Sequence, residues 1–346
     1  MRQPILACSL TVLFACGGGD GGGDNPAVDA RVFEDAPVVI GDKFTLSYGP
    51  VTIAPGEENT KCVWMRLSNP AAIKVRQMHN VLNASSHHLI VYKDDMDQTE
   101  QLEPVDCTPF TGALNTSGMI APIMITQKAD DTLTLPDRVA YTLDANQMIK
   151  LEMHYLNATE APQEVRATVE FYRAEESTID HEADILFIGS PDIDLAAGET
   201  ETLKQFFKVP DGLDLSQSNI FAITGHTHHH GTDVQVRVGP SKNGPMTSVY
   251  APQPFSWSEP ETTVHNPPFS VPAGGGMEFE CTWTNTSGSR VEFGESANDE
   301  MCFFWAYYYP SQGSKVCIHT QQFNAPDGFD VCCPGSQLCS LIEDMF

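Results

Sequence analysis

The chain has 346 residues, of which 46 are acidic and 19 basic, and its net charge at pH 7 is −27. This charge argues against a nucleic-acid-binding protein, because such proteins need Lys and Arg to displace counterions from phosphate. The acidic field would favour cationic over anionic small molecules, although a simple solvated acidic surface is the preferred interpretation. A length prior of roughly 150 residues per domain predicts two domains.

The first 30 residues carry export signals. Residues 1–15 indicate a signal peptide, with a basic start and an apolar run that is too short to span a membrane. Leu13-Phe14-Ala15-Cys16 resembles the lipobox of bacterial lipoproteins, in which the cysteine becomes the lipidated N-terminus. Residues 16–30 then indicate a flexible Gly- and Asp-rich tether. We expect an exported bacterial lipoprotein that faces the periplasm or the cell surface and is held at the outer membrane by the lipid on Cys16 alone. An ordinary cleaved secretory signal is the alternative.

Short runs of alternating apolar residues, separated by turn residues, fill the rest of the chain. They end near residue 172, and after a polar interval at residues 174–182 they resume and continue to residue 309. This pattern is typical of antiparallel sandwiches. We predict an all-β protein of two tandem, jelly-roll-like antiparallel β-sandwich domains, at residues 31–176 and 177–346, with no detectable sequence repeat between them.

Two histidine features stand out in the first predicted domain. His87 and His88 precede a four-residue apolar run. Because neighbouring residues in a strand point to opposite faces, both imidazoles can meet one metal only if the strand bends there or if the two rings use different nitrogens. His154 and Glu152 alternate with the apolar face of residues 151–155, so we expect them to point outward into a cleft. Each feature alone is weak evidence for a metal site.

The second predicted domain holds four of the eleven histidines within residues 226–230. The flanking alternation predicts one strand over residues 221–238, in which His226 and His228 share a face about 6.6 Å apart and His229 points away. His230 would share the ligand face only if the following glycine leaves the strand undisturbed. A polar surface turn is the alternative interpretation of the cluster.

A further strand is predicted at residues 299–309, and Met301, Phe303 and Trp305 share one of its faces. Core packing is the ordinary role of such a face.

Taken together, these motifs resemble the copper type II, ascorbate-dependent monooxygenases, the family of peptidylglycine α-hydroxylating monooxygenase and dopamine β-hydroxylase. The shared order is a His-His pair, a His-Tyr strand end, a His-x-His strand and Asp-Glu-Met-Cys followed by aromatic residues and Tyr-Tyr-Pro, over residues 44–310. The resemblance implies two copper sites, one for electron transfer at His87, His88 and His154, and one for oxygen binding at His226, His228 and Met301. Imidazole serves both copper oxidation states, whereas a thioether favours Cu(I), the state that meets dioxygen. The histidines that match no ligand position are expected to be structural: His79, His181, His265 and His319.

The implied activity is that of an oxidoreductase acting on paired donors, with reduced ascorbate or another one-electron donor as one of them. It would hydroxylate an sp3 carbon of a small organic substrate with O2 and release the second oxygen atom as water. In the family each domain is a β-sandwich, and the coppers face each other across an open, solvent-filled gap. The main rival is a non-catalytic copper-binding lipoprotein, and a second is an adhesive surface sandwich that binds zinc adventitiously. The complete ligand set, with a single thioether, favours the enzyme.

Eight cysteines remain after Cys8 and Cys16 are set aside, and this even count indicates disulfides in an oxidising compartment. The resemblance implies the pairs Cys62–Cys107 and Cys281–Cys302. The family cysteine expected before the His-x-His strand is absent around residues 204–208, so Cys317, at its usual partner position, must pair elsewhere. Because adjacent cysteines rarely bond each other, we expect two tail disulfides, with the pairing left open, that join Cys317 and Cys339 to Cys332 and Cys333.

The residues at three positions that contact the substrate in peptide-amidating relatives indicate which substrates this protein can take. Peptide-amidating members of the family anchor a substrate carboxylate with an arginine two residues before His-x-His and with polar residues just after the methionine. Here those positions hold Thr224, Phe303 and Trp305. This argues against amidation of glycine-extended peptides. We expect Phe303 and Trp305 to line an apolar or aromatic pocket that takes a small aromatic or cationic substrate.

Overall fold

The computed structural model describes residues 43–107, 119–322 and 327–339. The predicted signal peptide, Cys16 and the tether lie outside the described residues. Within these ranges the regular structure consists of β-strands and one 3₁₀ turn, η1 (Glu176–Thr178), which confirms the predicted all-β class. No helix in the described part of the chain is long and apolar enough to cross a membrane.

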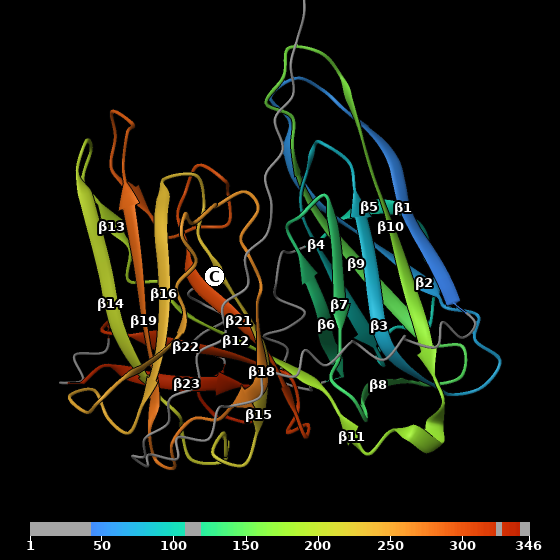
Figure 1. Cartoon of the computed structure of the whole chain (residues 1–346). Coiled ribbons are helices and arrows are strands. Elements are labelled where there is room, and N and C mark those ends of the chain that lie inside the picture. Colours follow the sequence, from blue (N-terminus) through green and yellow to red (C-terminus); the bar gives the residue numbers. More distant parts are fainter. Residues whose placement is uncertain (1–42, 108–118, 323–326, 340–346) are drawn as a thin grey trace, which may run out of the picture. The chain divides into compact units, whose positions relative to one another are not determined.

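The strands up to residue 182 form two sheets (Figure 1). One has the order β1-β10-β3-β8-β11, with β7 beside β3, and the other has the order β5-β2-β9-β4-β6. Their pairings are antiparallel except β11 with β8. The bounds are β1 (Lys43–Ile53), β2 (Glu58–Arg66), β3 (Ile73–Leu82), β4 (Ser86–Asp94), β5 (Gln101–Asp106), β6 (Ile120–Thr126), β7 (Asp130–Thr134), β8 (Val139–Leu143), β9 (Met148–Leu156), β10 (Gln163–Ala174) and β11 (His181–Glu182).

The strands from residue 184 onward form three more sheets, coloured from yellow-green to red in Figure 1. Their orders are β18-β15-β21-β12-β22-β23, β14-β19-β16-β17 and β13-β20. The bounds are β12 (Asp184–Ser190), β13 (Asp194–Leu195), β14 (Thr200–Lys208), β15 (Asn219–His226), β16 (Gly231–Gly239), β17 (Thr247–Tyr250), β18 (Thr263–Phe269), β19 (Gly276–Thr284), β20 (Val291–Glu292), β21 (Cys302–Tyr309), β22 (Lys315–Thr320) and β23 (Phe329–Cys333).

The central strands of the six-stranded sheet of the second group, β15, β21, β12 and β22, are buried on both faces. Alternate residues of β21 belong to different apolar clusters, as the predicted face of Met301, Phe303 and Trp305 requires. The face with Met301, Phe303 and Trp305 packs in an apolar cluster that also contains residues of the first group of strands, such as Ile90. Phe304, on the opposite face, packs in a second cluster formed by the second group alone. The strands of both groups accordingly lie in one compact unit. The division at residue 176 stays a prediction, and β11 extends a sheet of the first group beyond it.

Each of the two groups of strands contains the same type of asparagine-centred turn, although their sequences show no repeat. Asn157 follows β9, and its Nδ2 donates to the backbone oxygens of Ala54 and Ala161. Asn285 follows β19, and its Nδ2 donates to the oxygens of Ala196 and Ser289 in the same pattern. In each turn the hydroxyl two residues later bonds the asparagine Oδ1 at 2.7 Å. Both halves therefore close this strand end with the same buried amide.

Four disulfides tie the strands together. Two are the implied pairs Cys62–Cys107 and Cys281–Cys302. The two tail pairs are Cys317–Cys332 and Cys333–Cys339, which is one of the pairings left open by the sequence. Cys281–Cys302 joins β19 to the first residue of β21, so it anchors the chain next to Met301.

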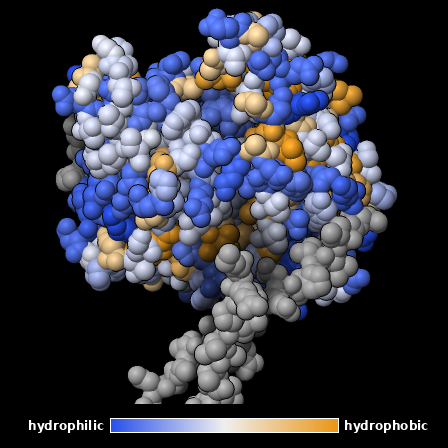
Figure 2. Space-filling model, turned by 45° about the horizontal axis from the view of Figure 1, so that its top comes forward, coloured by the Kyte–Doolittle hydropathy of each residue, from blue (hydrophilic) through white to orange (hydrophobic). Residues whose placement is uncertain are grey.

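The exposed surface is mainly polar. Figure 2 shows one face on which hydrophilic residues predominate and hydrophobic residues gather in separate patches. Large apolar side chains with substantial exposure are few among the described residues, and Leu102 and Val264 are the most exposed of them.

Candidate metal centre

A bulge in β4 brings His87 and His88 onto one site. Ser86 is opposite Tyr155 of β9, but His88, two residues later, is opposite His154, only one residue along β9. His87 is therefore the extra residue of a β-bulge, which turns its side chain away from the strict alternation of a strand. The sequence left open whether the strand bends or the two rings use different nitrogens. The structure shows the bend, and the unpartnered ring nitrogens, His87 Nε2 and His88 Nδ1, are also different ones.

The two neighbouring imidazoles meet His154 in a compact group. The ring centroids are 5.3 Å apart for His87 and His88, 5.2 Å for His87 and His154, and 5.0 Å for His88 and His154. One ring nitrogen of each residue lies within 4.8 Å of the others, close enough for one ion to bind all three. His87 Nε2 and His88 Nδ1 are buried and have no hydrogen-bond partner among the described residues. Buried polar atoms without a partner are rare in folded proteins, so these nitrogens fit a metal-binding role.

A carboxylate holds the third imidazole. His154 Nε2 donates to Glu58 Oε1 at 3.0 Å, which leaves Nδ1 to face the other two rings. Glu58 also accepts the backbone N–H of Ala297 at 2.7 Å and the Ser296 hydroxyl at 3.1 Å. A carboxylate behind a metal-binding histidine fixes the ring's tautomer and orientation. Glu58 therefore links the first histidine group to the 294–299 loop of the second half.

Glu152 does not share the outward position expected for it. It is fully buried, and its Oε2 accepts hydrogen bonds from Lys150 Nζ and from the Tyr92 hydroxyl, both at 3.1 Å. Only His154 of the predicted polar face contributes to the metal centre. The expectation was wrong for Glu152 because β9 lies in a sheet covered on both sides, so alternation does not separate core from solvent there.

Glu58 makes the stability of the fold depend on acid pH. The hydrogen bond from His154, followed by those from Ala297 and Ser296, lowers the pKa of Glu58 from 4.5 to about 2, although burial opposes this. A folded-state pKa below the unfolded value adds stability that is complete above about pH 4.5 and lost as the pH falls to about 2. The shift corresponds to at most about 3 kcal/mol, and partial exposure of the side chain reduces that.

We therefore expect Glu58→Gln to be less stable than the wild type at pH 7, with most of this difference lost near pH 2.5. Urea unfolding at both pH values measures the difference. Glu160→Gln, at an exposed site, is the matched control and should track the wild type. A stability loss at Glu58→Gln that is the same at both pH values would contradict this account.

The His226–His230 cluster forms a corner between two sheets, and the predicted single strand over residues 221–238 is wrong. β15 ends at His226, residues 229–230 form a turn, and β16 begins at Gly231 in the other sheet. A Cβ on Gly231 would lie 1.9 Å from the Thr227 hydroxyl, so only glycine allows this close turn. His226 and His228 nonetheless stay together, with ring centroids 5.2 Å apart.

Glu300 explains why the strand stops. Its buried carboxylate accepts the backbone N–H groups of His228 at 2.9 Å and His230 at 2.7 Å. It also accepts Trp283 Nε1–H at 2.8 Å and the Met301 N–H at 3.3 Å. These N–H groups are thus satisfied without a strand partner, which lets the chain turn inside the protein. One side chain holds both the histidine corner and the residue before β21.

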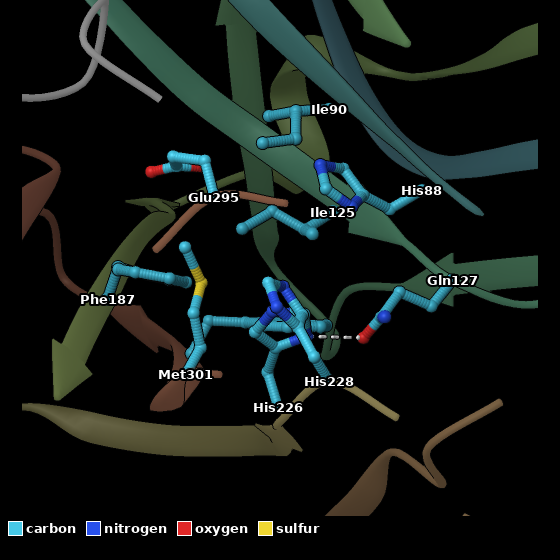
Figure 3. A pocket seen from close by; sticks show the side chains of 10 residues that line it. His88, Ile90, Ile125, Gln127, Phe187, His226, His228, Glu295 and Met301 are labelled. Carbon is cyan, nitrogen blue, oxygen red and sulfur yellow. Dashed lines mark hydrogen bonds between the residues drawn. The ribbon is translucent and has the colours of Figure 1, made fainter. Parts of the chain in front are cut away.

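Met301, His226 and His228 line one small cavity. Figure 3 shows the thioether and the two imidazoles facing the same space. His226 Nδ1 donates to Gln127 Oε1 at 3.0 Å and His228 Nδ1 to the Asp299 carbonyl at 3.1 Å, so the Nε2 atoms are those that would bind a metal. The free volume is about 20 Å³, the room of one water-sized group.

Of the two residues predicted to line a substrate pocket, Trp305 lines this cavity and Phe303 does not, and the role of the cavity in substrate binding stays a prediction. Trp305 lines the cavity, together with Phe187, Ile90 and Ile125. Phe303 lies behind Phe187, with stacked ring centroids 4.7 Å apart, and does not line the cavity. Both share a strand face, but Phe187 of the adjacent β12 covers Phe303, and strand alternation carries no information about a neighbouring strand.

Four of the clustered imidazoles, those of His87, His88, His226 and His228, are held in the neutral form that binds metals. Burial lowers the pKa of His87 to about 3 and that of His228 to about 4, and neighbouring histidines act in the same direction. Burial likewise lowers the pKa of His88 and of His226 well below 6.5. Neutral imidazoles and a thioether are a donor set suited to copper, so the residues present fit the implied metal.

The two histidine groups lie in contact, which corrects the expected solvent-filled gap. The ring centroids of His87 and His228 are 6.1 Å apart, and those of His88 and His226 are 6.3 Å apart. The physical reason is the shared apolar cluster, which packs the sheets that carry the two groups against each other. The five imidazoles thus form one continuous cluster.

The remaining histidines take structural positions. His229 is exposed and donates to the Ala297 carbonyl at 2.6 Å, and His230 packs on it, so neither joins the group that could hold a metal. The four others contact protein groups: His79 with Asp130 and Glu170, His181 with Tyr309, His265 with the Val249 carbonyl, and His319 with Asp330.

Three residues that support the centre, and Glu295, which lines the cavity, escaped the sequence analysis. Glu300 had one usable signal, since it is an acidic residue directly before a predicted ligand and a buried strand. Glu58, Gln127 and Glu295 carry no such signal. Glu58 and Gln127 are distant in sequence from the residues they hold, and only the packing of strands brings them near.

Comparison with known proteins agrees with this centre. Residues 195–326 match the model of the "copper type II ascorbate-dependent monooxygenase, C-terminal domain", a range that includes His226, His228 and Met301. Among solved structures, similarity is found to the major capsid protein P2 of bacteriophage PM2 (8% identity, 79% of this chain and 100% of that chain, TM-score 0.35). It is also found to the VP2 subviral particle of infectious bursal disease virus (10% identity, 78% and 71%, TM-score 0.22). We draw no conclusion about this protein from similarities with such low TM-scores. Residues 195–326 thus belong to the copper type II ascorbate-dependent monooxygenase family, as its C-terminal domain.

Proposed function

We propose that this protein is a copper-dependent monooxygenase that hydroxylates an sp3 carbon of a small organic substrate, with O2 and with ascorbate or another one-electron donor. The observation that carries the proposal is the pairing of a three-imidazole group with a two-imidazole, one-thioether cavity. The match of residues 195–326 to a family of ascorbate-dependent copper enzymes supports it.

Each group has a role in this proposal. His87, His88 and His154 hold the electron-transfer copper, and His226, His228 and Met301 hold the oxygen-binding copper. Bound copper supplies one-electron redox chemistry and oxygen activation. The side chain of Glu58 orients His154, and Gln127 orients His226. Ile90, Ile125 and Phe187 form apolar walls that limit water beside the reacting carbon.

The overall reaction balances as substrate R–H with O2, two electrons and two protons giving R–OH and water. Two separate one-electron sites match the delivery of two electrons from a donor that gives one at a time. Contact between the imidazole groups leaves a short path from one site to the other.

The test is metal titration followed by oxygen uptake. The mature protein should bind two copper ions and consume O2 when ascorbate and a hydroxylatable substrate are both present. Two bound coppers with no turnover over a broad substrate panel would instead favour the non-catalytic copper-binding lipoprotein.

The location is part of the proposal. Export as a lipoprotein through Cys16, to the periplasmic or outer face of the outer membrane, would place the protein where disulfides form. All eight cysteines of the described residues are paired, which agrees with such a compartment. The mass of the mature N-terminus, with or without a lipid on Cys16, decides between this and an ordinary secretory signal.

A further inference from the structure

A second cavity borders the histidine group of the first half. We call it the Trp257 pocket, and it is lined by residues 82–87, 127, 129, 156, 257–259 and 297. Its volume is about 260 Å³. Of the six predicted metal ligands, His87 alone is among the described residues that line it. The Trp257 pocket is therefore separate from the cavity that contains Met301, where oxygen would bind.

The indole of Trp257 offers a flat surface beside the imidazole of His87. The centroids of these two rings are 5.9 Å apart. Trp257 lies between β17 and β18, is partly exposed and belongs to neither apolar cluster, whereas Phe255, two residues earlier, packs against one of them. Core packing thus does not account for the position of the indole. A planar molecule stacked on it would lie next to His87.

The Gln127 side chain adds a hydrogen-bond donor to the same lining. Its Oε1 accepts from His226 Nδ1 at 3.0 Å, the contact that the dashed line marks in Figure 3. Gln127 is 6% exposed, and its Nε2 is buried without a hydrogen-bond partner among the described residues. Because an unpaired buried donor is costly, a ligand oxygen that accepts from Nε2 would be stabilised.

Gln127 also lines the cavity that contains Met301, so one side chain separates the two spaces. A molecule in the Trp257 pocket would touch His87 directly and would be one amide away from His226. This position adjoins both imidazole groups without occupying the oxygen-binding cavity. It is the position from which a small electron donor could serve the centre.

The charges around the Trp257 pocket disfavour an anionic donor. Neither Lys nor Arg is among the described residues that line it, and Glu259, which is exposed, is the one carboxylate there. The whole chain carries a net charge of −27. Ascorbate is an anion at pH 7, whereas a phenol, with a pKa of about 10 as for tyrosine, stays neutral. Repulsion therefore selects a neutral donor over ascorbate.

We propose that the Trp257 pocket binds the electron donor and that this donor is a neutral aromatic diol of the hydroquinone class. This rests on the proposed monooxygenase function and names its reductant. The ring stacks on Trp257, and one hydroxyl oxygen accepts from Gln127 Nε2. The volume lies just below the roughly 300–1,000 Å³ of pockets for drug-sized ligands, which suits a single ring.

The electron balance agrees with the proposed reaction. Oxidation of hydroquinone to benzoquinone breaks two O–H bonds and releases two electrons and two protons. One electron goes to each of the two copper sites. Hydroxylation of R–H by O2 consumes these two electrons and two protons, so R–H, O2 and hydroquinone give R–OH, water and benzoquinone.

The first experiment measures binding without any redox reaction. Copper-free protein is titrated calorimetrically under argon at pH 7 with hydroquinone and, separately, with ascorbate. The wild type should bind hydroquinone at least about tenfold more tightly than ascorbate. Trp257→Leu should weaken hydroquinone binding at least about fivefold, because stacking is lost, whereas Trp257→Phe keeps a ring and should stay within about twofold of the wild type.

A charge reversal tests the selection against anions. Glu259→Lys should reduce the preference for hydroquinone over ascorbate at least about fivefold. Glu261→Lys is the matched control, since it makes the same change of charge at an exposed position two residues away that does not line the Trp257 pocket. This control should keep the wild-type preference.

The second experiment links binding to electron delivery. In copper-loaded protein under argon, hydroquinone below saturation should remove the Cu(II) EPR signal at least about fivefold more slowly in Trp257→Leu than in the wild type. Equal affinity of the wild type for hydroquinone and ascorbate would overturn the proposal. So would unchanged binding or unchanged reduction in Trp257→Leu. Neither experiment contains oxygen or a hydroxylatable substrate, so these results are independent of whether the protein hydroxylates anything.

Discussion

Met301→Leu is expected to abolish ascorbate-dependent oxygen uptake while the protein stays folded and keeps copper at His87, His88 and His154. Leucine retains the volume of the side chain but removes the sulfur, so the proposed oxygen-binding site would lose one of its three predicted ligands. Loss of supporting residues around a metal costs roughly 10- to 100-fold in affinity or activity, so loss of a ligand should cost at least about 100-fold. Oxygen uptake and copper content measure the two effects.

Leucine is chosen over alanine because Met301 is only 6% exposed and belongs to the core. An alanine there would create a cavity that costs about 2–5 kcal/mol and would confuse a metal effect with unfolding. Met277→Leu, at a buried methionine of β19, is the control and should keep full activity. Wild-type turnover by Met301→Leu would mean that the thioether is core packing and that the oxygen-binding site lies elsewhere.

Glu300→Gln is expected to destabilise the fold and to weaken copper binding at His226 and His228. Four N–H groups donate to the Glu300 carboxylate. Those of His228, Trp283 and Met301 donate to Oε2, and that of His230 donates to Oε1. An amide can keep the first three, but its NH2 must then face the His230 N–H, which leaves two buried donors opposed. The expected loss is about 1–3 kcal/mol, measured by chemical unfolding of the copper-free protein.

The expected loss of copper affinity follows from the position of Glu300 beside two predicted ligands. Glu300 holds the backbone of His228 and of Met301 at once, so a shifted carboxylate would move two of the three predicted ligands. Affinity at this site should fall about 10- to 100-fold, while the His87, His88 and His154 site is unaffected. Glu292→Gln, at an exposed position on β20, controls for the lost charge. Unchanged stability and copper affinity would show that the corner is held by packing alone.

The sequence by itself was informative where the determining interactions are local. Alternation along residues 299–309 placed Met301, Phe303 and Trp305 on one face, as β21 confirms, because adjacent side chains of a strand must point to opposite sides. The order of motifs pointed to the copper monooxygenase family, which the match at residues 195–326 supports. The ligand roles of His87, His88, His154, His226, His228 and Met301 stay predictions, although the structure brings each set together.

Tertiary structure decided what depends on distant partners. The bulge at His87 appears only in the register between β4 and β9, and the turn after β15 depends on the Glu300 carboxylate, which is 72 residues from His228 in sequence. The contact between the two imidazole groups arises where strands of the two halves pack together, and Phe303 is excluded from the cavity by Phe187 of the adjacent strand β12. Alternation reports only which side of its own strand a residue faces, so the chemistry of the cavity was not readable until the sheets were packed.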